Sequence, residues 1–106
     1  MSPGRSATSK VRRDARVLAL LVLYEADTAR HQPGDVLARH LSERGPDNAS
    51  SAYAQQLVSG VVKERVELDA VLVRCAPDHP FDDVAAIDRN VLRIALHEIT
   101  SQSAPA

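Results

Sequence analysis

The sequence contains one cysteine, no tryptophan and three other aromatic residues, and each shortage excludes a class of protein. The single Cys75 has no partner for an intramolecular disulfide, which is typical of a reducing compartment and predicts a cytoplasmic protein. Because Tyr24, Tyr53 and Phe81 are the only aromatic side chains, the core must rest on Leu, Val, Ile and Ala. No stretch approaches the ~20 apolar residues that span a bilayer, so we expect no membrane association.

Residues that carry enzyme chemistry are also scarce. The four histidines do not combine with cysteines or acids into a metal motif, and the four glycines are scattered rather than gathered in a phosphate-binding loop. No nucleophile has a base close to it in the sequence. Asp82 and Asp83 precede a predicted helix and Asp88 lies in its first turn, where carboxylates are typical caps and dipole partners. We therefore predict a non-enzymatic protein with no catalytic residues, no cofactor and no metal site.

Apolar residues recur at helical spacing along most of the chain, and no strand pattern is present. The 106 residues suffice for one domain, so the sequence predicts a single all-α domain. We expect helices over residues 10–29, 35–44, 52–62, 64–75 and 86–100. Asp35 is the expected cap of the second helix, a bend is expected near Lys63, and Gly60 predicts close helix packing or a kink. Residues 1–9 lack periodicity, which predicts a flexible basic arm before a helical domain over residues 10–106.

Positive charge gathers at the start of the chain. The net charge is −1, yet residues 1–16 contain five basic side chains and one acid, so the rest of the chain is acidic. Arg12 and Arg16 are four residues apart and share a helix face, and Arg13 lies about 100° away from Arg12. Cations at a helix N-terminus oppose the macrodipole and slightly destabilise the helix. Spacing alone leaves two interpretations open: a solvated charged turn, or a site where arginines contact phosphate and unpaired bases.

Five sequence segments carry a resemblance to one known family of helical proteins. Residues 12–16, RRDAR, followed by LVLYE at 21–25, resemble the arginine-rich opening helix of that family. Residues 53–61, YAQQLVSGV, resemble its middle helix, and residues 67–69, ELD, resemble the continuation of that helix. The most specific match is IDRNVLRIALHEI at 87–99. Together the segments cover nearly the whole chain from about residue 10. In their order and spacing they resemble the NusB family of transcription antitermination factors.

The resemblance implies a fold of two small helical bundles and a function in RNA binding. Such proteins bind the boxA element of ribosomal RNA transcripts together with ribosomal protein S10, and help RNA polymerase read through terminators with other Nus factors. The RNA-binding residues implied for this chain are Lys10, Arg12, Arg13, Arg16 and Tyr24. Asp88 matches an acidic position near the S10 face. For Tyr24 the alternative is a core residue with a hydrated hydroxyl group.

Several positions depart from the family pattern. Asp14 stands where many relatives have a further basic residue, His79 where tryptophan is common, and His97 where tyrosine is common. Family members continue through two further helices beyond the segment that matches here, so we expect this fold to lack them. Those helices help to cover the last helix, and their absence predicts that apolar residues such as Ile99 are exposed. An exposed apolar helix favours self-association.

Two alternatives to an antitermination factor remain. A NusB-like domain also precedes some RNA cytosine methyltransferases, and this chain could be a fragment of such a domain, although it has no room for the catalytic part. The second alternative is a degenerate module that binds only proteins. The first predicts a methyltransferase sequence encoded downstream, and the second predicts binding to S10 without RNA.

Overall fold

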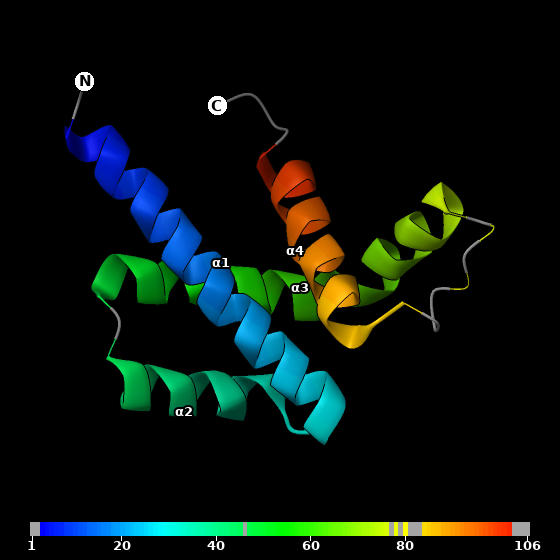
Figure 1. Ribbon diagram of the computed structural model, residues 1–106, viewed down its shortest axis with the longest axis horizontal. Helices are drawn as coiled ribbons and strands as arrows, with labels where there is room; N and C mark the ends of the chain where they lie inside the picture. The colour runs from blue at the N-terminus through cyan, green and yellow to red at the C-terminus, as the bar shows by residue number, and fades with distance from the viewer. Residues whose placement is uncertain (1–2, 46, 77, 79, 81–83, 103–106) are drawn as a thin grey trace.

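The computed structural model describes residues 3–45, 47–76, 78, 80 and 84–102, with side chains described from residue 9 to residue 101 within these ranges. Four helices make up the fold: α1 (Pro3–Ala29), α2 (Pro33–Arg44), α3 (Asn48–Cys75) and α4 (Ala86–Gln102). No strand occurs among the described residues. The predicted all-α class is confirmed, and Figure 1 shows α1 crossing α3 while α2 and α4 lie on either side of the crossing.

Helix α1 forms the centre of the core because it packs against each of the other three helices. The stripe predicted from the spacing of its apolar residues is buried, and it meets the apolar faces of α2, α3 and α4. None of the buried core residues in the described ranges is aromatic, which agrees with the prediction that the core rests on Leu, Val, Ile and Ala. Those buried apolar residues are Ala15, Leu18, Ala19, Val22, Leu23, Val36, Leu37, Ala54, Leu57, Val58, Val61, Leu68 and Ile94.

The start of α1 differs from the prediction. The helix begins at Pro3, seven residues before the expected start at Lys10. Apolar periodicity cannot reveal this extension, because residues 3–9 are PGRSATS and offer no apolar stripe to bury. Proline is well tolerated in the first turn of a helix, where its missing N–H would have no partner. The predicted flexibility of residues 1–9 concerns motion and stays a prediction.

Helix α2 also begins earlier than predicted, and its cap is different. Gln32 occupies the N-cap position without a side-chain hydrogen bond, Pro33 follows it, and Asp35 lies inside the first turn. The prediction of Asp35 as the cap is therefore wrong, because proline sets the backbone angle that starts this helix. At the other end Gly45 has a φ of 59°, and its N–H donates to the Leu41 carbonyl at 3.2 Å. Glycine adopts this left-handed backbone conformation more easily than any other residue.

Helix α3 is a single element rather than the two that were predicted. Its N-cap is Asp47, whose carboxylate accepts a hydrogen bond from the Ser50 backbone N–H at 2.7 Å. Helical structure continues through Lys63 to Cys75, so the predicted division is wrong. Figure 1 shows the axis of α3 turning toward its yellow-green end. The described residues between Ala76 and Pro80 contain no helix, as the two prolines there predict.

A buried ion-pair network joins α1, α3 and α4. The Arg93 side chain is 3% exposed, and its Nε and Nη2 donate to the two carboxylate oxygens of Asp69 at 2.7 and 2.9 Å. Its Nη1 donates to Asp27 at 2.9 Å, and the Asn90 amide donates to the same oxygen of Asp27 at 3.0 Å. Arg65 pairs with the other Asp27 oxygen at 3.1 Å. These bonds hold the three helices together near the C-terminal end of α1, at the other end of the helix from its arginines.

Candidate nucleic-acid interface

One exposed stripe of α1 carries cations that face solvent. Lys10 and Arg13 are both exposed, and neither makes an ion pair or hydrogen bond with the part of the chain that the structure describes. Arg13 and Tyr24 are eleven residues apart, which places them on the same helix face. Val17 lies between them on this face and is also exposed. The stripe therefore presents two unpaired cations, an apolar residue and an aromatic ring along one side of the helix.

Tyr24 is 40% exposed and is not a core residue. Eleven residues of helix rise separate it from Arg13 by about 16 Å. Its backbone carbonyl accepts a hydrogen bond from the Thr28 hydroxyl at 2.8 Å. The interpretation of Tyr24 as a core residue is therefore unsupported, and its exposed ring remains accessible to a ligand that follows α1.

Arg12 and Arg16 point instead toward α3 and α4. The Arg12 guanidinium lies 5.8 Å from the centre of the Tyr53 ring, which is within the range of a cation–π contact. Arg16 forms a two-point ion pair with Glu98, with Nε to Oε1 at 2.7 Å and Nη2 to Oε2 at 2.9 Å. The Tyr53 hydroxyl also donates to Glu98 Oε2 at 2.6 Å. Four side chains from three helices thus form one cluster, Arg12–Tyr53–Glu98–Arg16.

The cluster keeps Glu98 charged. Partial burial alone would raise the pKa of Glu98, but the hydrogen bonds from Arg16 and Tyr53 and the charges of Arg16 and Arg12 lower it below its usual value. The hydrogen bond to Glu98 in turn raises the pKa of Arg16. Glu98 is therefore a carboxylate, and Arg16 a guanidinium, across the physiological pH range.

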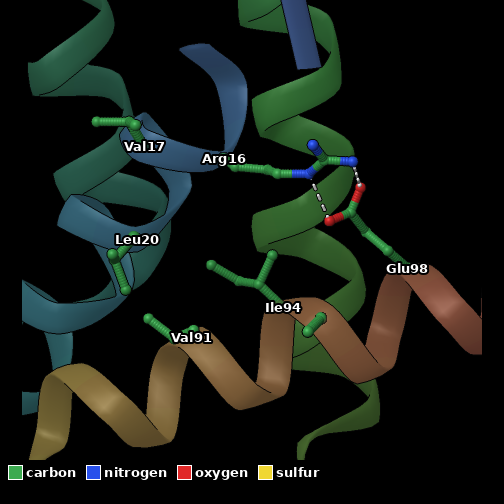
Figure 2. Close-up of a pocket in the computed structure, with 7 residues that line it drawn as sticks. Arg16, Val17, Leu20, Val91, Ile94 and Glu98 are labelled. Carbon is green, nitrogen blue, oxygen red and sulfur yellow. Dashed lines mark hydrogen bonds and ion pairs between the residues drawn. The ribbon is translucent and has the colours of Figure 1, made fainter. Parts of the chain in front are cut away.

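An apolar groove runs beside this cluster between α1 and α4. Its volume is about 330 Å³, and Figure 2 shows Arg16 and Glu98 at one end of it with Val17, Leu20, Val91 and Ile94 along its sides. Ala95 completes the lining. Ile99, one helical turn after Ala95 on α4, is 65% exposed. The predicted exposure of Ile99 is confirmed, whereas Ile94, five residues earlier on α4, is buried in the core.

Asp88 is not part of the arginine cluster. It is exposed in the first turn of α4, ten residues before Glu98, which is about 15 Å along the helix. A partner at Asp88 would therefore contact a different surface from a ligand at Arg13. Tyr53 and Glu98 were not predicted as site residues, because they are 45 residues apart and no local pattern connects either with Arg12 or Arg16.

The described residues contain neither a membrane-spanning helix nor a metal-binding cluster. No helix within the described ranges is long and apolar enough to cross a bilayer. Among the same residues, no group of three or more His, Cys, Asp or Glu side chains is arranged to hold a metal ion.

Comparison with known proteins identifies similar sequences over most of the chain. The family model described as the NusB family matches residues 13–106. The chain is 33% identical over 96 residues to the transcription antitermination protein NusB of Chloroflexus aggregans, covering 91% of this chain and 64% of that protein. It is 37% identical over 92 residues to the NusB protein of Dehalococcoides mccartyi, covering 87% and 64% respectively. The chain thus spans somewhat less than two thirds of the length of these relatives.

Solved structures show the same fold. A crystal structure of antitermination factors NusB and NusE in complex with double-stranded RNA contains a chain that matches with a TM-score of 0.80 and 27% identity, over 90% of this chain and 70% of that chain. A crystal structure of a plectonemic RNA supercoil contains a match with a TM-score of 0.82 and 27% identity, over 89% and 69%. With the family model covering nearly all of the sequence, the chain belongs to the NusB family.

Proposed function

We propose that this chain binds single-stranded RNA through the first half of α1 and acts as a non-enzymatic transcription antitermination factor in the cytoplasm. The observation that carries the proposal is the exposed stripe in which Lys10 and Arg13 have no partner among the described residues. Two cations that are free of carboxylates provide favourable phosphate contacts, because no ion pair has to be broken first. Arg12 adds a third exposed cation, which contacts the Tyr53 ring and forms no ion pair among the described residues.

The same stripe suits RNA with unpaired bases, because it offers more than contacts to phosphate. Exposed Tyr24 lies on the face of Arg13, and an aromatic ring offers a stacking surface to an unstacked base. The proposed RNA is a boxA-like element of a ribosomal RNA transcript. The similar structures support RNA as the class of ligand, since one contains NusB and NusE with double-stranded RNA and the other contains an RNA supercoil. The preference for unpaired RNA rests on the exposed Tyr24 ring alone.

The proposed protein partner is ribosomal protein S10, with the RNA polymerase elongation complex and other Nus factors as the wider assembly. Asp88 is the proposed contact for S10, because it is exposed on α4 about 15 Å from the arginine cluster and leaves room for RNA and protein at once. One similar structure contains NusB together with NusE, which is ribosomal protein S10, and RNA. It supports the binding of RNA and S10 at the same time.

Filter binding to a boxA-like RNA across a salt series tests the RNA-binding surface. The double variant Arg12→Ala/Arg13→Ala should bind more weakly, and its plot of log affinity against log salt should be flatter by about 1.4, which corresponds to two phosphate contacts on a single strand. The matched control is Lys63→Ala/Arg74→Ala, which removes two exposed cations from the second half of α3. Equal slopes for wild type and Arg12→Ala/Arg13→Ala would refute the proposed role of these arginines.

Gel filtration with S10, with and without RNA, tests the partner. Co-elution that requires an intact Asp88 supports the proposed assembly. Co-elution with S10 in the absence of any RNA binding would favour a module that binds only proteins, and failure to bind either molecule would favour a degenerate product.

A further inference from the structure

Arg16 lies in the basic segment of the sequence, but its side chain forms an ion pair, whereas those of Lys10 and Arg13 form none with the described residues. Its side chain is 45% exposed, so a ligand on α1 can reach it. Two of its three guanidinium nitrogens are already bonded to Glu98, and Figure 2 shows the third pointing away from that carboxylate. The charge of Arg16 is therefore compensated at short range, unlike the charges of Lys10 and Arg13.

Glu98 is held in place independently of Arg16. Its side chain is only 12% exposed, and the Tyr53 hydroxyl donates to it at 2.6 Å from α3. If a phosphate bound Arg16 in place of Glu98, the Glu98 carboxylate would lose its cation. It would remain largely buried, with only the hydrogen bond from Tyr53. Uncompensated charge at a partly buried position is unfavourable, and the phosphate would also be repelled by Glu98 at close range.

We propose that Glu98 competes with nucleic-acid phosphates for Arg16 and thereby limits sequence-independent binding of RNA at the start of α1. The proposal rests on the proposed function, since it concerns the same surface. In the wild-type protein the cations that contact phosphate are then Lys10, Arg12 and Arg13. Removing the charge of Glu98 adds Arg16 as a fourth.

The test compares Glu98→Gln with wild type in two assays. The first is fluorescence anisotropy with poly(U), an RNA without a boxA sequence, over a salt series. Glu98→Gln should bind roughly two- to fivefold more tightly at low salt, which is the range of one exposed ion pair, and its salt slope should be steeper by about 0.7. The second assay is the salt concentration that elutes the protein from immobilised heparin, which should rise. The matched control Glu67→Gln removes one exposed carboxylate from α3 and should leave the salt slope unchanged.

Two further variants make the result specific to Arg16. Arg16→Ala/Glu98→Gln should lose the gain and return close to wild type in both assays. Tyr53→Phe keeps the ring under Arg12 but removes the hydroxyl that fixes Glu98, so it should give a smaller gain in the same direction. This variant also provides the test if Glu98→Gln does not fold, which circular dichroism will show.

Weaker or unchanged binding of Glu98→Gln to both polyanions would overturn the proposal, as would a gain that persists in Arg16→Ala/Glu98→Gln. Failure of the proposed function has a different signature. In that case wild type would show no salt-dependent binding to poly(U) or to boxA-like RNA. The heparin assay would still show whether Glu98 withholds Arg16 from a polyanion.

Discussion

The imidazole ring of His97 on α4 occupies the space in which a Cβ atom on Gly60 of α3 would lie. A Cβ built on Gly60 would meet His97 Cε1 at 2.1 Å and Nε2 at 2.3 Å, much closer than such atoms approach in proteins. The ring is fixed there by a hydrogen-bond contact of 3.0 Å between its Nδ1 and Glu64. The two helices therefore approach closely at this point because position 60 has no side chain.

Gly60→Ala should lower the free energy of unfolding by about 1–2 kcal/mol, because the His97 ring must move and lose its contact with Glu64. In a His97→Ala background the sign should reverse. Without the ring, alanine in a helix interior is more favourable than glycine by about 0.5–1 kcal/mol. Urea unfolding of the two single variants and the double variant measures both effects. Equal destabilisation in the two backgrounds would show that the ring is not the cause.

Arg93→Ala should lower the free energy of unfolding by about 2–4 kcal/mol, because it leaves Asp27 and Asp69 without the guanidinium that bridges them. Arg93→Lys keeps the charge but cannot reproduce the two-point contact with Asp69, so its loss should be intermediate. Thermal and urea unfolding of both variants provide the measurement. The exposed Arg74→Ala is the control and should change stability by less than about 0.5 kcal/mol.

Stability should fall in acid, with Asp27 and Glu98 among the contributors. Burial raises the pKa of each carboxyl group, but hydrogen bonds and nearby arginine charges lower both below their ordinary values of 3.8 and 4.5. A pKa that is lower in the folded state stabilises the fold above the unfolded value, and this contribution is lost as the pH falls through the folded value. The free energy of unfolding should therefore decrease below about pH 4.5.

Urea unfolding over an acid pH series measures this dependence. Glu98→Gln should show a shallower decline than wild type, because glutamine has no proton to bind in this range. Glu67→Gln, which changes an exposed residue on α3, should retain the wild-type decline. If Glu98→Gln and wild type lose stability equally over this range, the ion pair with Arg16 does not favour the charged carboxyl group.

The sequence predicted the helices well wherever they bury an apolar stripe. The end of α1 at Ala29 was predicted from the proline and glycine that follow it, and the buried face of α1 from the spacing of its apolar residues. The start of α4 at Ala86 was also predicted correctly. The extension of α1 to Pro3 could not be predicted, because residues 3–9 lack apolar periodicity. The unbroken course of α3 through Lys63 could not be predicted either, because a change in helix direction and a helix end give similar sequence patterns.

Of the candidate site, only the residues that lie on α1 were predicted from the sequence. Lys10, Arg12, Arg13 and Arg16 are close in sequence, so their clustering was evident from it. What each arginine does depends on residues far along the chain: Arg12 and Arg16 differ from Arg13 because of Tyr53 on α3 and Glu98 on α4. Those partners become visible only when three helices are packed together.

The central position of α1 has a consequence for genetic screens. Under the proposed function, substitutions that abolish RNA binding will be recovered from both sides of this helix, but for different reasons. Changes at Ala15 or Val22 will remove the protein from the cell through unfolding and degradation, since these residues are fully buried. Changes at Lys10 or Arg13 will leave its abundance intact. Measuring protein level beside the phenotype therefore separates residues that contact RNA from residues that only hold the helix in place.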